Sequence, residues 1–200
     1  AKSILLYSAT KGYRHESISD GIAAIKKIGL AKNWTITATE DSSIFTPEKL
    51  QQFSGIIFLN TTGDILDEKG QEALQGYIHN GGGLAGIHAA TDCEYNWPWY
   101  NKLIGAWFES HPEQQKASLK VVGKHPSTAM LPATWSRKDE WYNFKNVSPD
   151  IKVLLMLDET SYKNGKMGAF HPSAWYHDFE GGKVFYTALG HTTESYTEPL

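Results

Sequence analysis

Gly81-Gly82-Gly83-Leu84-Ala85-Gly86-Ile87-His88-Ala89-Ala90-Thr91-Asp92 is the most informative stretch of this 200-residue chain. The apolar run in its middle predicts a buried strand, and the glycines allow the backbone to bend sharply around it. In a strand–turn–helix elbow of this kind, one side chain is held above the carboxyl ends of the strands. Here that side chain is His88, and an imidazole in such a position indicates metal binding or proton transfer rather than an acyl-enzyme.

Strands and helices alternate around this stretch. Three helices are predicted, from the spacing of isoleucines between Ile18 and Ile28, from an N-cap followed by proline at Thr46-Pro47, and from an amphipathic run over 67–79. The alternation predicts an α/β fold with a parallel sheet and helices on both faces, and ligands of such sheets bind beyond the carboxyl ends of the strands. The predicted strands cover residues 3–8, 34–39, 55–59, 84–87, 118–122, 151–157, 173–178 and 183–189.

Composition excludes several classes of protein. Hydrophobic residues make up 40% and charged residues 20% of the chain, as in an ordinary globular protein, and residues 1–200 are expected to form one domain. A net charge of −3 with scattered lysines predicts no nucleic-acid partner. No run reaches the ~20 apolar residues of a membrane span. The single cysteine, Cys93, excludes an internal disulfide and a cysteine-rich zinc site.

Two further features set expectations about cofactor and context. Gly81-Gly82-Gly83 precedes a strand instead of joining a strand to a helix, so no nucleotide cofactor is expected. No signal sequence is visible in the chain, which leaves cytoplasm and periplasm both open. The last predicted strand lies close to Leu200, so a closing helix further on and a larger parent protein are both open possibilities.

Five histidines stand beside predicted strand ends or in turns rich in glycine and proline: His15, His88, His111, His171 and His191. His15 follows the first predicted strand and His191 the last, so a parallel sheet would bring both to the same edge as His88. Neutral imidazoles bind Zn, Mn, Fe and Ni, and we expect a divalent ion, Zn²⁺ first, on these three residues. His171 and His177 share one face of a predicted strand and are further candidate ligands. The alternative is a polar, hydrogen-bonded cleft without metal.

Two carboxylates are candidate partners of these imidazoles. Asp92 lies four residues after His88, and Glu140 precedes a strongly aromatic block. Either can complete a histidine-rich metal site, orient a ring nitrogen or act as a general base. The alternatives are a helix N-cap for Asp92 and a solvated surface carboxylate for Glu140. Aromatic rings also stack on sugars, and we expect a cleft wall formed by Trp97, Trp99 and Trp141, with core packing for the other tryptophans.

Motif residues run in order over nearly the whole chain: Thr10-Lys11-Gly12-Tyr13-Arg14-His15, Gly81 to Asp92, Asn96-Trp97-Pro98-Trp99-Tyr100, His111-Pro112, His125-Pro126, Asp139-Glu140-Trp141-Tyr142-Asn143-Phe144, His171 to His177 and Tyr186 to Tyr196. In these blocks the chain resembles the ThuA-like (trehalose utilisation) domain of the class I glutamine amidotransferase-like superfamily. The resemblance implies a flavodoxin-like three-layer sandwich with a mostly parallel central sheet. Amidotransferases carry a cysteine nucleophile at the elbow, whereas this chain has His88 there and Cys93 five residues further on. Glutamine hydrolysis is therefore not expected.

The resemblance also implies a role in carbohydrate metabolism, beside sugar dehydrogenases that oxidise a glucoside at carbon 3. The implied substrate is a keto-sugar such as a 3-keto-glycoside or 3-keto-trehalose, processed by proton abstraction and elimination, hydrolysis or isomerisation. We expect His88 or Glu140 to take the proton beside the ketone, with Asp92 nearby, and His191 to assist at the leaving oxygen. His111, His171 and His177 are expected to line the substrate cleft. A non-catalytic carbohydrate-binding domain of a larger protein is the alternative, and a homo-oligomer is possible under either.

Overall fold

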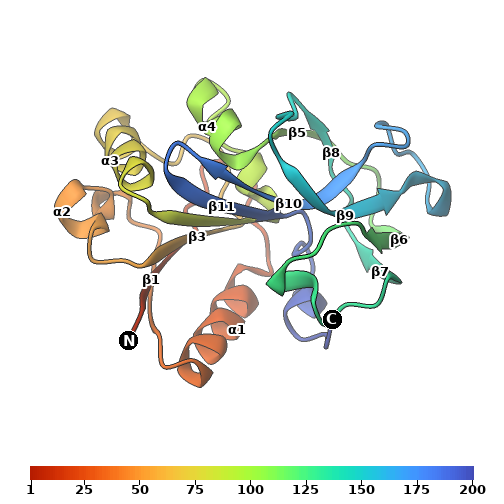
Figure 1. Cartoon of the computed structure of the whole chain (residues 1–200), viewed down its shortest axis with the longest axis horizontal. Coiled ribbons are helices and arrows are strands. Elements are labelled where there is room, and N and C mark those ends of the chain that lie inside the picture. The colour runs from red at the N-terminus through yellow and green to blue at the C-terminus, as the bar shows by residue number, and fades with distance from the viewer.

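The computed structural model describes all 200 residues and is built on a nine-stranded sheet with the order β2-β1-β3-β4-β11-β10-β9-β6-β7 (Figure 1). A separate two-stranded sheet pairs β5 with β8. The strands are β1 (Ser3–Tyr7), β2 (Thr35–Thr39), β3 (Gly55–Leu59), β4 (Gly83–Ile87), β5 (Trp107–Ser110), β6 (Gln115–Val121), β7 (Thr134–Asp139), β8 (Asn143–Lys145), β9 (Lys152–Asp158), β10 (Pro172–Phe179) and β11 (Gly182–Thr187).

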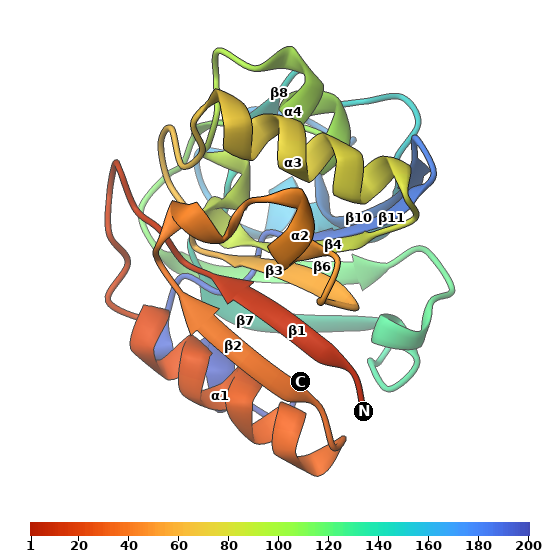
Figure 2. The same ribbon diagram turned by 90° about the vertical axis from the view of Figure 1, so that its left-hand side faces the viewer.

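Helices cover both faces of the parallel part of the sheet. Helix α1 (Ile18–Ala31) lies on one face, whereas α2 (Pro47–Leu50), α3 (Glu68–His79) and α4 (Pro98–Ile104) lie on the other (Figures 1 and 2). None of these helices is both long and apolar enough to cross a bilayer. The predicted α/β fold with helices on both faces is confirmed.

The sheet is parallel over only part of its width. β1, β2, β3, β4 and β11 pair in parallel, so their carboxyl ends share one edge. β10, β9, β6 and β7 continue the sheet with antiparallel pairing. Antiparallel neighbours need no helical crossover, which is why the second half of the chain contains few helices. The structure therefore shows a mixed α/β sheet, and the flavodoxin-like three-layer sandwich stays a prediction.

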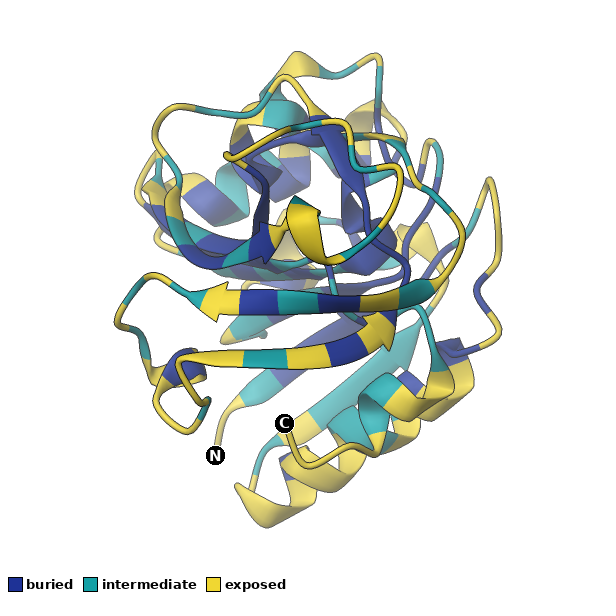
Figure 3. Cartoon of the chain, turned by 90° about the vertical axis from the view of Figure 1, so that its right-hand side faces the viewer, coloured by how far each residue is buried: buried dark blue, intermediate teal, exposed yellow.

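Local signals in the sequence explain where helices begin. Thr46 Oγ1 accepts a hydrogen bond from the backbone N–H of Lys49 at 3.3 Å, and Pro47 occupies the first turn of α2, as predicted. The Asp67 carboxylate caps α3 by accepting from Gly70 N at 2.8 Å. The edge strand β7 alternates buried and exposed residues, as a strand with one covered face does (Figure 3).

Two glycines of the parallel half predict opposite effects on stability. A Cβ added at Gly86 in β4 would stand 2.6 Å from Ile104 Cδ1 and 3.0 Å from Ala90 Cβ, so Gly86→Ala is expected to destabilise the fold by about 1–3 kcal/mol. A Cβ at Gly76, inside α3, would meet nothing within 4 Å, so Gly76→Ala is expected to stabilise by about 0.5–1 kcal/mol. Urea unfolding of both variants measures the two changes in stability. Equal midpoints would contradict this account of the packing around β4.

Candidate metal and catalytic site

His88 stands at the tip of the elbow that the glycine-rich stretch predicts. It follows β4 directly and opens a short 3-10 turn, His88–Thr91, with a left-handed φ of 51°. A left-handed φ is uncommon outside glycine, so the surroundings must hold this backbone in place. They do so through the Tyr186 hydroxyl, which donates to the His88 carbonyl at 2.6 Å. The imidazole is fully buried at the carboxyl edge of the sheet.

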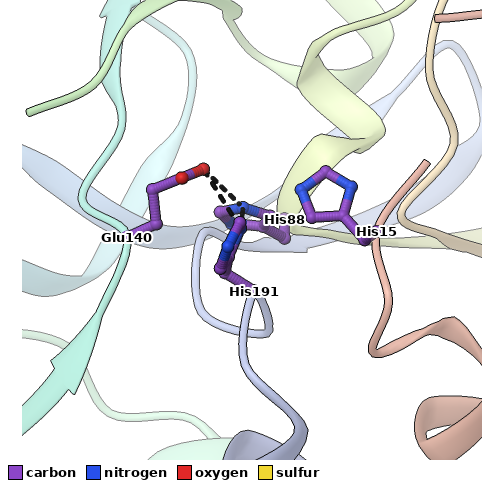
Figure 4. Close-up of side chains that lie close together, drawn as sticks. All are labelled: His15, His88, Glu140 and His191. Carbon is purple, nitrogen blue, oxygen red and sulfur yellow. Dashed lines mark hydrogen bonds and ion pairs between the residues drawn. The ribbon is translucent and has the colours of Figure 1, made fainter. Parts of the chain in front are cut away.

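Four side chains from distant parts of the chain converge on this point: His15, His88, Glu140 and His191 (Figure 4). Each offers one ligand atom, and these atoms all lie within 4.8 Å of one another. His15 follows β1, His88 follows β4, Glu140 follows β7 and His191 follows β11. The structure thus brings together the three predicted histidines and one of the two predicted carboxylates, and we call the group the tetrad.

Proton positions in the tetrad follow from its hydrogen bonds. His88 Nδ1 lies 2.6 Å from the Ala188 carbonyl oxygen, which can only accept, so Nδ1 carries the proton. A neutral His88 then presents the lone pair of Nε2 to Glu140 Oε1 and to His191 Nδ1, each at 3.3 Å. His191 Nδ1 is also 3.2 Å from Glu140 Oε1. Lone pairs that face one another at such distances require a cation between them, either a proton or a metal ion.

His15 adds a second indication of a missing partner. It is 4% exposed, and its Nδ1 is enclosed without a hydrogen-bond partner. Its ring contacts those of His88 and His191 edge-on, with centroids 5.0 and 4.9 Å apart. Burial, together with His88 and His191, lowers the pKa of His15 to about 3, so the ring is neutral. An unpaired buried nitrogen is costly, and a neutral ring beside two other imidazoles is suited to ligate metal.

Glu140 supplies the negative charge of the tetrad. Burial alone would raise its pKa, but the interactions with His191 and His88 hold the pKa of this carboxyl far below its usual range. Three imidazoles and one ionised carboxylate form a ligand set that suits Zn, Mn, Fe or Ni. The hydrogen bond from His88 Nδ1 to a backbone carbonyl is the kind that orients metal-bound histidines. The residues therefore fit a divalent ion.

Asp139 and Asn60 hold the tetrad in place, and neither was predicted. The fully buried Asp139 carboxylate accepts from the backbone N–H groups of Glu140, Gly190 and His191 at 2.8, 3.1 and 3.3 Å. Asn60 Oδ1 accepts from Ala89 N at 3.3 Å, and its Nδ2 donates to the Gly190 carbonyl at 3.2 Å. Asp139 thus ties together two tetrad segments, and Asn60 ties the elbow to the His191 loop. No local pattern in the sequence reveals such long-range contacts.

Replacing Asp139 by asparagine is expected to loosen the tetrad without removing any of its members. The variant loses the charge that faces three N–H donors and the Arg137 guanidinium, 3.4 Å away. Because groups that orient ligands typically contribute 10–100-fold to metal affinity, we expect a Zn²⁺ dissociation constant raised by about that factor. Competition with a chromogenic chelator measures the constant. An unchanged constant in a folded variant would remove Asp139 from this role.

Two predicted residues lie at the margin of the tetrad. His111 Nε2 is 3.5 Å from Glu140 Oε2, and the His111 side chain is 42% exposed, so it stands at the solvent side. Asp92 is partly buried and accepts a hydrogen bond from the Tyr95 hydroxyl at 2.6 Å instead of capping a helix. Burial raises the pKa of Asp92, and the hydrogen bond from Tyr95 opposes part of this rise.

Three predicted site residues belong to the core instead. His171 Nε2 donates to the Tyr142 carbonyl at 2.7 Å, while its Nδ1 lies 2.6 Å from Glu159. His177 Nε2 donates to the Leu103 carbonyl of α4 at 2.7 Å, so the shared face of these two histidines packs inward. Trp141 is 1% exposed within a hydrophobic cluster under β6 and β9. None of the three lines the site. The sequence suggested otherwise because buried strand faces and substrate clefts contain the same types of residue.

Trp97 and Trp99 lie away from the tetrad. They stack on each other at 5.0 Å, and Trp99 Nε1 donates to Glu180 at 2.7 Å. Glu180 belongs to the turn between β10 and β11, and that turn sits at the amino edge of the parallel strands, opposite His88. Both tryptophans pack against the main core. The structure therefore does not bring Trp97, Trp99 and Trp141 together as a wall beside the tetrad.

Two tyrosines contact the tetrad: Tyr13 lies edge-on to His15 with ring centroids 4.8 Å apart, and the second is Tyr142. Its ring stacks on His88 with centroids 4.0 Å apart and an interplanar angle of 29°. Phe108 of β5 also packs on the Tyr142 ring, with centroids 4.4 Å apart. Burial raises the pKa of the Tyr142 phenol well above its usual value. The sequence places Tyr142 two residues after Glu140, but nothing in that pattern shows which ring reaches His88.

The main cavities of the molecule lie elsewhere. Their volumes are about 530, 520, 260 and 660 Å³, and none is lined by His15, His88 or Glu140. His15, His88 and Glu140 are buried and the His191 side chain is 13% exposed, so the tetrad is nearly closed, with His111 beside it at the solvent side.

Comparison with known proteins places this geometry in context. A family model described as trehalose utilisation, ThuA, matches residues 3–200. A protein described as ThuA-like from Bacteroides uniformis superposes with a TM-score of 0.84 at 27% identity, over 99% of this chain and 85% of that one. Another from Parabacteroides merdae gives a TM-score of 0.79 at 21% identity, over 96% and 80%. A β-galactosidase from Bacillus circulans shares the fold alone, with a TM-score of 0.65 at 11% identity over 98% of this chain and 29% of the enzyme. No curated protein matches the chain.

Proposed function

The chain belongs to the ThuA, or trehalose utilisation, family, and on that premise we propose that it is a metal-assisted enzyme of carbohydrate metabolism that acts on keto-sugars such as 3-keto-glycosides. The observation that supports this most is the lone pair of His88 Nε2, which faces Glu140 Oε1 and His191 Nδ1 at 3.3 Å, so that a cation belongs between them. His15, with an enclosed and unpaired Nδ1, completes the ligand set. Zn²⁺ is the proposed ion.

The chemistry of a keto-sugar suits this arrangement. A ketone at carbon 3 acidifies the proton at carbon 2, and loss of that proton permits elimination of the group at carbon 1 or isomerisation. A divalent ion held by the tetrad would supply a Lewis acid for the ketone oxygen. An unoxidised glycoside would instead call for two carboxylates at a fixed separation.

The proton acceptor must lie outside the tetrad. In the proposed site His88 Nε2 and Glu140 Oε1 would both ligate the ion, so neither atom would be free to take a proton from substrate. Asp92 is the carboxylate beside the tetrad that is not one of its members, and burial raises its pKa, which makes it a stronger base. We propose that Asp92, rather than His88 or Glu140, is the base that removes the proton from carbon 2. His191, at the exposed side, keeps its proposed place near the leaving oxygen.

Thiol chemistry has no place in this proposal. Cys93 is fully buried, its Sγ donates to Thr61 Oγ1 at 3.2 Å, and burial raises the pKa of the thiol well above its usual value. A thiolate nucleophile requires the opposite environment. Glutamine hydrolysis by an amidotransferase-type cysteine is therefore not part of the proposed function.

A non-catalytic carbohydrate-binding domain is the second candidate, and the closed form of the tetrad favours it. Glu140 is 8% and His191 13% exposed at the side chain, and a metal site closed by four protein ligands is typical of a structural role. Under this alternative, metal would stabilise the fold and sugars would bind unchanged.

One assay separates the two functions. Metal-replete protein is incubated with 3-keto-trehalose or a 3-keto-glucoside and, in parallel, with the unoxidised parents. The enzyme proposal predicts loss of the keto-sugars with the parents untouched, and a sugar dehydrogenase would be the source of such a substrate. Equal turnover of the parents, or no turnover of any keto-sugar, would reject it and favour the binding domain.

A further inference from the structure

Tyr142 differs from the other buried tyrosines in what its hydroxyl does. The chain buries four tyrosines almost completely: Tyr7, Tyr100, Tyr142 and Tyr186. Three of these hydroxyls donate to a backbone carbonyl, at Ile65, Ala90 and His88 respectively. The Tyr142 hydroxyl makes no hydrogen bond at all, although buried Tyr O–H groups usually find a partner.

The Tyr142 oxygen is also not sealed inside the protein. The enclosed polar atoms that lack a partner are Ser8 Oγ, His15 Nδ1, Trp107 Nε1 and Arg137 Nε. Tyr142 is 3% exposed as a residue, and its oxygen is not one of these enclosed atoms. The small exposed part of Tyr142 thus includes a free donor.

The ring that carries this donor is rigidly held against the tetrad. It stacks on His88 at 4.0 Å and is packed by Phe108 at 4.4 Å, and His111 lies near-parallel to it at 6.2 Å. Its backbone carbonyl accepts from His171 Nε2 at 2.7 Å. His171 is in turn fixed by Glu159, 2.6 Å from its Nδ1. A donor fixed in this way needs little reorganisation when a ligand arrives.

From this geometry we infer that Tyr142 is a further catalytic residue, whose hydroxyl donates a hydrogen bond to the carbonyl oxygen of the substrate. The inference rests on the proposed keto-sugar function. When a base removes the proton beside the ketone, the C–H electron pair becomes a carbon–carbon π bond and the carbonyl π pair moves to oxygen. Tyr142 keeps its proton and binds the oxygen more tightly as negative charge develops there.

Tyr142→Phe tests this inference because it removes the hydroxyl and leaves the ring on His88. Loss of one donor to a developing oxyanion typically costs about 10²–10³ in kcat, so we expect a fall of that size with KM and metal content little changed. Because the hydroxyl has no partner within the protein, the melting temperature is expected to stay the same or rise. The matched control is Tyr186→Phe, which loses the bond to the His88 carbonyl and is expected to melt roughly 2–4 °C lower.

The outcomes separate the two hypotheses. If wild type turns over a 3-keto-glucoside and Tyr142→Phe does so within threefold, the role of Tyr142 is overturned and the proposed function stands. If wild type turns over no keto-sugar, the proposed function fails, and equilibrium binding of the 3-keto-glucoside to both metal-loaded proteins decides about Tyr142. At least tenfold weaker binding by Tyr142→Phe would support the hydroxyl as a ligand donor, and equal binding would overturn it.

Discussion

Replacing His88 by alanine is expected to abolish stoichiometric metal binding and to lower turnover of a 3-keto-glycoside by about 10³-fold or more. The substitution removes the Nε2 lone pair that faces Glu140 and His191. It also removes the Nδ1–H donor to the Ala188 carbonyl, so the elbow loses both its ligand and its anchor. Metal content by elemental analysis and the keto-sugar assay measure the two effects separately.

His177→Ala is the matched control for this variant. His177 is also a buried histidine with one ring nitrogen bonded to a backbone carbonyl, that of Leu103 at 2.7 Å, but it lies outside the tetrad. Both variants should lose stability, whereas only His88→Ala should lose metal. If the two variants kept or lost metal together, metal retention would reflect general packing and not ligation by His88.

Replacing Asp92 by asparagine is expected to lower kcat for keto-sugars by about 10²–10⁴-fold while the bound metal is retained. The amide has nearly the shape of the carboxylate and still accepts from the Tyr95 hydroxyl, which lies 2.6 Å away, but it cannot take up the proton from carbon 2. Because Asp92 is not a member of the tetrad, metal content should stay near that of wild type. Steady-state kinetics on metal-replete protein measures kcat and KM.

Asp178→Asn serves as the control for Asp92→Asn. Its carboxylate is 75% exposed and pairs only with Lys183, which is 86% exposed, so its removal should change neither kcat nor metal content. If Asp92→Asn kept wild-type kcat, the proton acceptor would have to be sought elsewhere, with His111 as the nearest alternative. If Asp92→Asn lost its metal, Asp92 would be needed for metal binding, and its role as a base would not be supported.

The close approach of His15, His88 and His191 could be predicted, because it depends only weakly on the order of the strands in the sheet. Each follows a parallel strand, and the carboxyl ends of parallel strands share one edge whatever their sequence separation. Glu140 is different, since it follows an antiparallel edge strand whose position in the sheet no local pattern reveals. Its candidacy came from its aromatic neighbours and from the motif block that contains it.

The predicted site residues that the structure places away from the tetrad share one physical cause. Trp97, Trp99 and Trp141 are expected in a cleft because aromatic rings stack on sugars, and His171 and His177 because they share a strand face. The same groups fill cores, and a buried tryptophan or histidine needs only one carbonyl partner, such as Gln115 O for Trp141 Nε1. Asp139 and Tyr142 could not be predicted, because their roles depend on contacts with residues far away in the sequence.

The most direct test of the central claim is the metal content of tag-free protein after reconstitution with Zn²⁺ and removal of excess ion. If His15, His88, Glu140 and His191 form one metal site, wild type should hold about one ion per chain. His88→Ala should then hold almost none. Wild-type protein with far less than one ion per chain, or His88→Ala with as much as wild type, would show that the tetrad is a hydrogen-bonded cluster and not a metal centre.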